Sequence, residues 1–344
     1  MSISFECDYT LGAHPKILEA LVATNFSHQP GYGEDEFTLA AQKAILSAAC
    51  CPDGEVFLLS GGTQTNRTVI SAVLAVYEGV ISAETGHIAV HEAGAIEASG
   101  HKVLTLPSHA GKLSADDLES FMAAFNADPT RAHTVWPGMV YVSQPTEYGT
   151  VYSREELSGL YRVCREHGLY FYVDGARLGY ALEGGFDGTL ADIAASCDGF
   201  YVGGTKVGCL CGEALVFPKG APKHFFTTVK QNGALLAKGR LLGVQFKTLF
   251  EDGLYFEISR NAIEKADRMR RLFSGLGFEF LLLTATNQIF VIMEKNLAQR
   301  LSEQVRFGFW EPYSATHDVY RFASCWATTD GDVDFLESAL RSAL

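Results

Sequence analysis

Two charged residues stand directly after apolar, strand-like runs, where a charge is useful for chemistry. Asp174 ends such a run in "YVDGARLGYAL", and Lys206 follows another in "GGTKVGCLCG". A lysine removed from water loses part of its affinity for protons and becomes a nucleophile toward carbonyl carbon. Most loop lysines are simply solvated, so Lys206 alone would mean little. The carboxylate 32 residues before it, at the end of the preceding run, favours a chemical role for the pair.

A glycine-rich turn in "SGGTQTN" could supply an anion site for the same chemistry. Gly61 and Gly62 allow a close backbone approach, and Thr63 opens a helical pattern whose free N–H groups favour an anion. The turn is neither a Walker loop nor a dinucleotide fingerprint, and such a turn is as often structural as functional. With Asp174 and Lys206 it completes what pyridoxal phosphate requires: a phosphate cradle, a carboxylate for the pyridine nitrogen and a lysine for the covalent bond.

A sheet must position these residues, and the chain carries the pattern for one. Seven short apolar runs recur in "EVFLLS", "GVISA", "KVLTL", "MVYVS", "LYFYV", "GFYVGG" and "EALVF". Helical patterns lie between most of them, such as "SREELSGLYRVCREHG", with Ser153 as cap before Glu156 and Gly168 as the stop. This alternation predicts a mainly parallel sheet covered by helices on both faces. Ligands of such sheets bind beyond the carboxyl ends of the strands, so the polar strand ends are expected to converge.

The pattern changes after about residue 245. A long charged helical segment, "GLYFEISRNAIEKADRMRRLFSGLG", is followed by the strand-like runs "FEFLLLT", "NQIFVIME" and "VYRFASCWAT" and by a last helical segment. We therefore expect a large α/β domain over residues 1–245 and a smaller α+β domain over residues 246–344.

Composition limits the partners and cofactors. The 344 residues carry a formal net charge of -13, which disfavours nucleic acid because phosphate binding needs clustered Lys and Arg. The eight cysteines lack the spacing of a metal site or a disulfide framework, so reduced cysteines and no metal are expected. The amino terminus has no signal-peptide pattern, and no apolar run is long enough for a bilayer. We expect a cytoplasmic protein with no membrane partner.

The ordered set of motifs resembles a known family. "YGED", "GGTQTN", "GHIAVHEAG", "VDGARL" and "GGTKVG" together are similar to the fold-type I pyridoxal-phosphate enzymes of the threonine aldolase and β-eliminating lyase family. The resemblance extends from "FECDYTLGAHP" to "YRFASCWAT", nearly the whole chain. It implies a three-layer α/β sandwich with a mainly parallel, mixed seven-stranded sheet and a smaller α+β carboxyl-terminal domain.

The resemblance also assigns residues to the cofactor. Lys206 matches the lysine that bonds to it, and Asp174 matches the carboxylate on its pyridine nitrogen. The other matching cofactor residues are Gly62 and Thr63 in the phosphate cradle, His87 on the ring face, Arg177 near the phenolic oxygen, and Arg240. Because Arg240 matches a residue that reaches the phosphate of a neighbouring subunit, the resemblance implies a homotetramer, a dimer of dimers with shared active sites.

Three residues are expected at the substrate. Arg321 in "YRFASCW" matches the arginine that grips the amino acid's carboxylate, a geometry that suits a bidentate guanidinium. Arg177 approaches the same carboxylate. Tyr32 in "YGED" is a further candidate, although the motif could also be only a capped helix start.

The chain departs from the family at three points. The Arg-Ser-Asp start of many members is replaced by "ECDYTLGAHP", which supplies Asp8 and Tyr9. "QPTEYG" places Glu147 where many members have a histidine near the substrate hydroxyl, so the general base is open between this carboxylate and a histidine. His91, directly before Glu92, could replace His87 as the neighbour of the ring.

The resemblance implies an aldolase that cleaves L-threonine, L-allo-threonine or related 3-hydroxy amino acids to glycine and an aldehyde. Its catalytic residues would be Lys206, His87, Asp174 and Glu147. A first alternative keeps the cofactor but eliminates a β-leaving group to give a keto acid and ammonia. A second is a noncatalytic α/β binding protein, against which the pairing of Asp174 with Lys206 argues.

Overall fold

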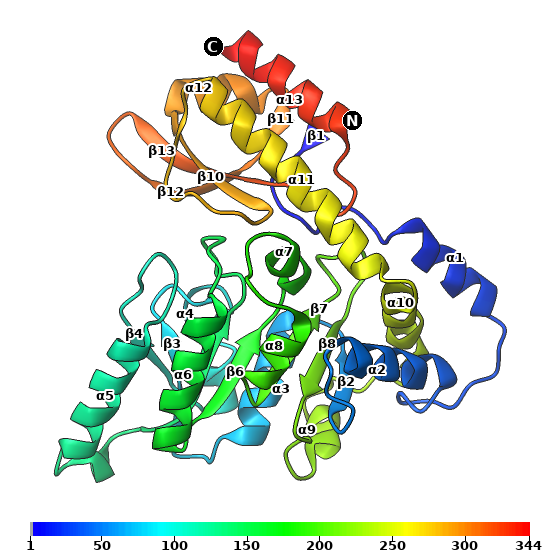
Figure 1. The fold of residues 1–344 in the computed structure, drawn as a ribbon, viewed down its shortest axis with the longest axis vertical. Helices are drawn as coiled ribbons and strands as arrows, with labels where there is room; N and C mark the ends of the chain where they lie inside the picture. Colours follow the sequence, from blue (N-terminus) through cyan, green and yellow to red (C-terminus); the bar gives the residue numbers. More distant parts are fainter. Residues whose placement is uncertain (1–2) are drawn as a thin grey trace.

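The computed structural model describes residues 3–344, which form a large sheet covered by helices and a second, smaller sheet. Figure 1 shows the smaller sheet above the large one, with the long helix α11 (Leu254–Gly275) running along it toward α10 (Arg240–Glu251). No helix in residues 3–344 combines the length and the apolar character needed to cross a membrane.

The large sheet has seven strands and is mostly parallel. In order across the sheet they are β2 (Glu55–Leu59), β8 (Glu213–Phe217), β7 (Gly199–Gly203), β6 (Tyr170–Asp174), β5 (Trp136–Ser143), β3 (Glu78–Ala83) and β4 (Val103–Leu106). Strand β8 runs antiparallel to both of its neighbours, β2 and β7, and the other neighbouring strands pair in parallel. The predicted mainly parallel, mixed seven-stranded sheet is confirmed.

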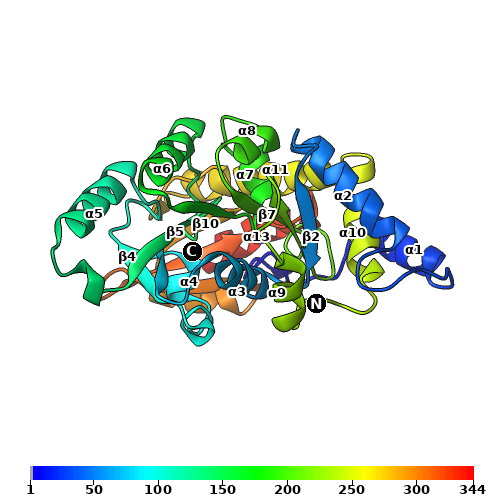
Figure 2. The ribbon, with the colours of Figure 1, turned by 90° about the horizontal axis from the view of Figure 1, so that it is seen from below.

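Both faces of this sheet are buried, which explains why its strands are apolar without alternation. On β6, Phe171 and Val173 pack into the core on one face, and Tyr172 between them packs into the core on the other. Helices of the first face are α2 (Glu36–Ala48), α5 (Ala115–Ala127), α6 (Arg154–His167) and α8 (Leu190–Ala195). Helices of the second face are α3 (Gly62–Val73), α4 (His87–Val90) and α9 (Phe225–Gln231). Figure 2 shows α6 and α8 on one side of the strands and α3 and α9 on the other.

The second sheet is antiparallel and belongs to the carboxyl-terminal part of the chain. Its order is β12 (Gly308–Pro312), β13 (His317–Ala323), β10 (Gln288–Glu294) and β9 (Glu279–Phe280). With α11, α12 (Lys295–Ser302) and α13 (Asp330–Ala343) it encloses a core of its own. The remaining elements are α1 (Pro15–Thr24), α7 (Leu178–Glu183), β11 (Val305–Arg306) and the short 3-10 helices η1 (Glu97–Ser99) and η2 (Arg131–His133).

The amino-terminal strand joins the two parts of the chain. Strand β1 (Ile3–Ser4) pairs in parallel with β11, and Phe5 is buried in the carboxyl-terminal core. The expected boundary at residue 245 falls within α10. We keep the division into 1–245 and 246–344 as a proposal, with residues 3–5 lying against the second part.

Candidate active site

Polar residues at the strand ends line one cavity at the carboxyl edge of the large sheet. It has a volume of about 310 Å³. Because β8 runs in the opposite direction, its first residue, Glu213, lies at this edge, opposite Leu59 and Gly203. Of the predicted site residues, the cavity brings together Gly62, Thr63, His87, Glu147, Asp174, Arg177 and Lys206. The other lining residues are Tyr9, Ser60, Gly61, Ser143, Pro145, Ala176, Tyr201, Thr205, Cys211 and Glu213.

The amino terminus of α3 forms one wall. Gly61 precedes this helix and makes no side-chain cap, so the N–H groups of the first turn are left for another acceptor. A Cβ on Gly62 would lie 3.1 Å from the hydroxyl oxygen of Tyr201, so the helix approaches β7 too closely for a larger residue to fit easily. Free N–H groups and the helix dipole suit a phosphate group here.

Asp174, at the end of β6, is held by several donors. Its Oδ2 accepts hydrogen bonds from the Tyr141 hydroxyl at 2.6 Å and the Asn66 amide at 2.9 Å, and its Oδ1 accepts one from the Ala176 N–H at 3.0 Å. Burial acts to raise the pKa of Asp174, but nearby His87 and these side-chain donors bring its pKa below the usual value. The carboxylate is therefore ionised and fixed in direction.

A hydrogen-bonded chain connects Asp174 to His87. The Asn66 amide also donates to Oε1 of Glu92 at 2.8 Å, and Nδ1 of His87 lies 2.8 Å from the same oxygen. Burial acts to lower the pKa of His87, but Glu92 and Asp174 raise it above its usual value. Glu92 is 5 % exposed, so this chain fixes the imidazole from the protein interior.

Lys206 follows β7 and reaches the cavity beside Tyr9. The Tyr180 hydroxyl donates to the backbone carbonyl of Lys206 at 2.6 Å, and Nζ lies 5.9 Å from the centroid of the Tyr9 ring. Burial lowers the pKa of Lys206, and the charge of Arg177 lowers it further. A lowered pKa leaves more of the amine unprotonated, as a nucleophile requires.

Glu213 is a buried carboxylate next to the lysine. Its oxygens accept hydrogen bonds from the Thr205 hydroxyl at 2.8 Å and the Gly204 N–H at 3.1 Å. Burial raises the pKa of Glu213 to about 8 despite these donors and the neighbouring charge of Lys206. This carboxyl therefore keeps its proton to a higher pH than an ordinary glutamate does.

Arg177 is held by a buried ion pair. Its Nε and Nη2 donate to the two carboxylate oxygens of Asp8 at 2.6 and 2.9 Å, and the Asn287 amide donates to Asp8 at 2.9 Å. Burial acts to raise the pKa of Asp8, but Arg177 lowers it to about 2. Asp8 lies in the amino-terminal segment "ECDYTLGAHP". It thus fixes the guanidinium of Arg177, which faces the cavity.

Glu147 lies across the cavity on the loop after β5. Its Oε1 accepts hydrogen bonds from the Ser143 hydroxyl at 2.6 Å and the backbone N–H of His87 at 2.9 Å. Burial raises the pKa of Glu147 above its usual value, although Ser143 and His87 oppose the shift. A carboxylate whose pKa is raised is a stronger base than an ordinary glutamate, so the side chain is suited to accept a proton.

Of the two histidine candidates, only His87 lines this cavity. The ring of His91 lies 5.7 Å from that of His87, between centroids, and belongs to an adjacent cleft. The geometry therefore favours His87 over His91 as the neighbour of a bound ring.

Arg321 lies on β13 and does not line the cavity. Its Nη1 donates to Oε1 of Gln288 at 3.3 Å, and its Nη2 donates to the carbonyl of Glu6 at 3.0 Å. Its pKa is lowered by burial and by the charge of Arg177. The role of Arg321 at the substrate's carboxylate stays a prediction.

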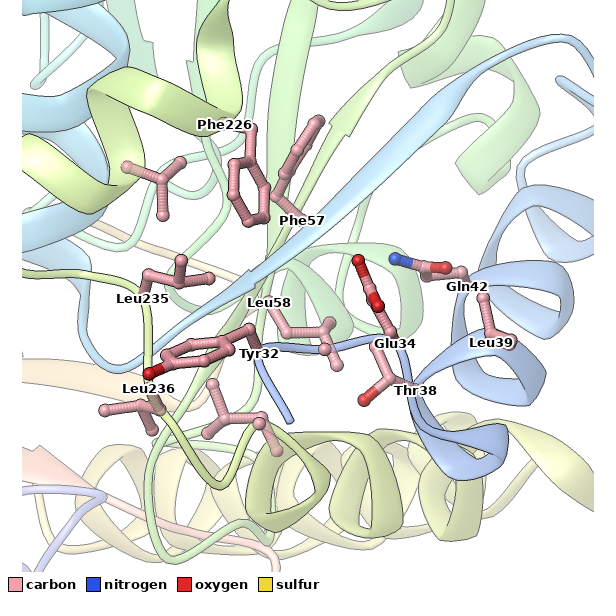
Figure 3. Close-up of a pocket in the computed structure, with 14 residues that line it drawn as sticks. Tyr32, Glu34, Thr38, Leu39, Gln42, Phe57, Leu58, Phe226, Leu235 and Leu236 are labelled. Atoms are coloured by element: carbon pink, nitrogen blue, oxygen red, sulfur yellow. The ribbon is translucent and has the colours of Figure 1, made fainter. Parts of the chain in front are cut away.

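Tyr32 and Arg240 lie outside the cavity as well. Tyr32 borders a separate, largely apolar pocket of about 330 Å³, where Figure 3 shows its ring with Leu235, Leu236, Phe57 and Phe226 around the same hollow. Arg240 begins α10 and donates to the carbonyls of Ser27, at 2.9 Å, and Thr24. Within one chain, neither side chain reaches the residues that would hold the cofactor.

Residues 3–344 contain no group of three or more His, Cys, Asp or Glu side chains arranged to hold a metal ion. All eight cysteines are free in the structure.

Comparison with known proteins identifies the family. The sequence matches the β-eliminating lyase family over residues 5–296. The chain belongs to this family. It is 30% identical to the low specificity L-threonine aldolase of Pseudomonas sp. strain NCIMB 10558, over 100% of this chain and 98% of that protein. The resemblance inferred from the sequence motifs is confirmed.

Solved structures agree with this β-eliminating lyase assignment. The threonine aldolase of Leishmania major superposes with a TM-score of 0.95 at 40% identity, covering 99% of this chain and 100% of that one. The aspartate aminotransferase of Thermus thermophilus has a TM-score of 0.71 at 14% identity, covering 100% of this chain and 92% of that one, and supports the fold alone. The expected fold class, including the smaller carboxyl-terminal part, is confirmed.

Sequence reasoning missed several residues of this cavity. They are the partners of the predicted ones: Asn66, Tyr141, Ser143, Tyr201, Thr205 and Glu213. Asn66 was within reach of inference, because it lies one helical turn after Thr63 on the same helix. Glu213 looked like the first residue of an ordinary strand, and only the antiparallel direction of β8 places it at the site.

Proposed function

We propose that this protein is a pyridoxal-phosphate-dependent aldolase that cleaves L-threonine, L-allo-threonine or related 3-hydroxy amino acids to glycine and an aldehyde. The observation that carries the proposal is the single cavity that joins Lys206, Asp174 and the uncapped amino terminus of α3. The similarity to threonine aldolases over nearly the whole chain supports this choice of reaction.

The residues fit pyridoxal phosphate. The first turn of α3, with Gly62 and Thr63, would hold the phosphate, and Lys206 would form the covalent bond. Asp174 would keep the pyridine nitrogen protonated, and His87 would lie against the ring. When bound, pyridoxal phosphate supplies an electron sink for the negative charge that bond cleavage leaves on the substrate.

Glu147 is the proposed general base. Its carboxylate would accept the proton of the substrate's β-hydroxyl group, directly or through a water molecule, as the Cα–Cβ bond breaks. The Ser143 hydroxyl and the His87 N–H fix one of its oxygens and leave the other for this task.

The substrate's carboxylate would be bound by arginine. Arg177 faces the cavity, and because Asp8 holds its Nε and Nη2, its Nη1 would be left to donate to the substrate's carboxylate. We propose Arg321 as the second partner, because its strand lies beside the amino-terminal segment that carries Asp8 and Tyr9.

We further propose a cytoplasmic homotetramer, a dimer of dimers in which Tyr32 and Arg240 serve the site of a neighbouring subunit. Their position outside their own cavity supports this sharing. The surface around them is apolar, with Leu39, Phe226 and Leu241 exposed, as expected of a face that another subunit covers.

A second candidate is β-elimination from an amino acid with a leaving group on the β-carbon. The match to the β-eliminating lyase family supports this second candidate. The same cavity would hold the cofactor, and only the bond that breaks would differ.

One experiment separates these reactions. The protein, saturated with pyridoxal phosphate, is incubated with L-threonine, L-allo-threonine, L-serine and L-cysteine, and glycine, aldehyde, ammonia and keto acid are measured. Glycine and acetaldehyde are expected in equal amounts from either threonine isomer. The Lys206→Ala variant should be inactive, whereas Lys223→Ala, which replaces an exposed lysine, should remain active. Ammonia and keto acid without glycine would replace the aldolase by the β-eliminating lyase.

A further inference from the structure

One buried carboxyl at the cavity has no part in the proposed reaction. Glu213 is 4 % exposed and lines the cavity together with Lys206. Its strand, β8, pairs with β2, and the Cα atoms of Glu213 and Leu59 are partners in this pairing. Leu59 ends β2 only two residues before Gly61, the N-cap of α3. Glu213 therefore stands beside the segment that leads into the helical turn proposed to hold the phosphate group.

The side chain of Glu213 holds the turn that carries Lys206. Its oxygens accept hydrogen bonds from the Gly204 N–H and the Thr205 hydroxyl, which belong to the two residues directly before the lysine. The N–H groups of Gly204 and Thr205 also donate to the carbonyl of Gly212, at 3.0 and 3.1 Å. A Cβ on Gly204 would lie 2.7 Å from this carbonyl oxygen, so the turn is closely packed against the start of β8. These contacts fix Glu213 and the lysine turn to one another.

The same contacts suit Glu213 in either protonation state. As a carboxylate it accepts both hydrogen bonds. As a neutral acid it can still accept the Gly204 N–H, while its own hydroxyl donates to Oγ1 of Thr205. The Thr205 hydroxyl can then turn to the carbonyl of Gly212, at a long 3.5 Å. Ionisation therefore changes the charge of Glu213 and not its position.

The surroundings of Glu213 make its ionisation sensitive to a further anion. Burial raises its pKa to about 8, and the charge of Asp174 acts in the same direction, whereas Thr205 and Lys206 act to lower it. A phosphate group in the same cavity would add negative charge and raise this pKa further. The other titratable groups that face Glu213 have pKa values raised by burial and stay neutral up to about pH 9; they are Tyr172 on β6, Tyr201 on β7, Cys209 in the following loop and Tyr255 on α11.

We propose that Glu213 must carry a proton for pyridoxal phosphate to stay bound, so that cofactor binding and protonation of this carboxyl are linked. The neutral acid holds the lysine turn without placing a charge beside the phosphate site, whereas the carboxylate holds the same turn and repels the phosphate group. The proton comes from solvent and forms an O–H bond on Glu213 as the cofactor binds. This inference rests on the proposed places of Lys206 and of the phosphate group in the cavity.

The test measures the dissociation constant of pyridoxal phosphate for the full chain, freed of cofactor, at a series of pH values. Glu213→Gln imitates the neutral acid, because its amide oxygen can accept the Gly204 N–H and its NH₂ group can donate to Thr205, but it cannot ionise. The constant of the natural protein is divided by that of the variant, so that titration of the cofactor itself cancels. This ratio should be constant below about pH 7 and rise by up to about tenfold per pH unit above about pH 8.

Calorimetry gives a second measure of the linkage. Binding heats in two buffers of different ionisation enthalpy, both at about pH 8.5, give the number of protons taken up with the cofactor. The natural protein should take up a larger fraction of a proton than Glu213→Gln.

Two further variants separate charge from position. Glu55→Gln alters an exposed carboxyl at the opposite edge of the same sheet, where Glu55 pairs with Phe217 at the other end of β8, and it should bind like the natural protein at every pH. Glu213→Ala removes the hydrogen bonds as well as the charge. It should bind about tenfold more weakly than Glu213→Gln at every pH, with the same pH dependence as that variant.

The outcomes distinguish this inference from the proposed site. Borohydride reduction and peptide mapping identify the lysine that is bonded to the cofactor. Bonding at Lys206, together with a ratio that does not change with pH and equal proton uptake, would overturn the role of Glu213 alone. Bonding at a different lysine would overturn the proposed site and this inference with it.

Discussion

Glu147 occupies the position at which many members of the family have a histidine. Its burial raises the pKa of its carboxyl group and so affects its action as a base. Glu147→Gln should reduce aldol cleavage by about 100-fold or more, because the amide keeps the shape but cannot accept a proton. The pKa of Glu147 is raised by burial, and the base must be ionised to act. Cleavage by the natural enzyme should therefore rise with pH through this raised pKa, and the variant should lack that limb. A pH profile of kcat with threonine measures both.

His91→Asn serves as the control for this variant, because His91 lies next to His87 but does not line the cavity. The absorption spectrum of the bound cofactor should stay unchanged in Glu147→Gln. An unchanged rate and acidic limb in that variant would remove Glu147 from the role of base, and a selective loss in His91→Asn would assign it there.

Asp8 links the amino-terminal segment to Arg177. Its pKa of about 2 lies below the ordinary value of 3.8, so ionised Asp8 contributes on the order of 2 kcal/mol to stability at neutral pH. A lowered pKa means that this contribution is present above the ordinary value and is lost as the pH falls toward about 2. Asp8→Asn should lower the free energy of unfolding by at least this amount, because Arg177 also keeps a buried, unpaired charge.

Urea unfolding at several pH values checks this expectation. The difference between the natural protein and Asp8→Asn should be constant from about pH 5 to 8 and shrink below about pH 4. Asp53→Asn, which alters an exposed carboxylate in the turn before β2, should change stability little. A difference that does not depend on pH would contradict the assigned ion pair.

At the scale of elements, α6 offers a clean test of local stability. The Ser153 side chain accepts a hydrogen bond from the Glu156 N–H, and the Glu156 side chain accepts one from the Ser153 N–H. Ser153→Ala should lower the free energy of unfolding by about 1 kcal/mol without changing kcat/KM, since the cap lies outside the catalytic cavity. Denaturant unfolding and the threonine assay give the two values. A loss of activity with unchanged stability would show that the cap affects the site instead.

The elements themselves were largely predictable. The capping box at Ser153 and the stop at Gly168 appear as expected, and all seven apolar runs form strands of one sheet. The cap and the stop depend on residues that are neighbours in the chain. The strands depend on burial of both faces of the sheet, which shows in the sequence as continuous apolar runs. The direction of β8 and the pairing of β1 with β11 depend on contacts between distant segments, and no local pattern encodes them.

The site residues, too, could be predicted where local patterns place them and were missed where contacts between distant segments do. Asp174 and Lys206 were found because strand ends of a parallel sheet meet at one edge. The Asn66 amide, by contrast, joins Glu92 and Asp174, which are 26 and 108 positions away along the chain.

At the scale of the whole molecule, a shared site makes a quantitative prediction. Lys206→Ala and Arg240→Ala subunits should each be weakly active or inactive, but a hybrid dimer would contain one complete site. Random mixing in equal amounts makes about half of the dimers hybrids, so about a quarter of the natural activity should return. Mixing after mild dissociation, followed by the threonine assay, measures the recovery.

A second mixture provides the matched control. Lys206→Ala with Asp174→Ala combines defects in residues that line the same chain's cavity, so every site in a hybrid keeps a defect. No activity should return. Equal recovery in both mixtures, or none in either, would argue against sharing through Arg240.

The pairing of β1 with β11 also bears on how the protein is made. Ile3 lies beside Val305, about 300 positions further along the chain, and Asp8 close behind it must reach Arg177 and Asn287. A ribosome releases residues 3–8 long before it has synthesised their partner strand. Strand β1 therefore lacks its partner through almost the entire synthesis, and Asp8, which can meet Arg177 half-way through it, gains Asn287 only when the carboxyl-terminal part emerges. The contacts that orient the amino-terminal segment beside the cavity are thus complete only when the chain is nearly finished.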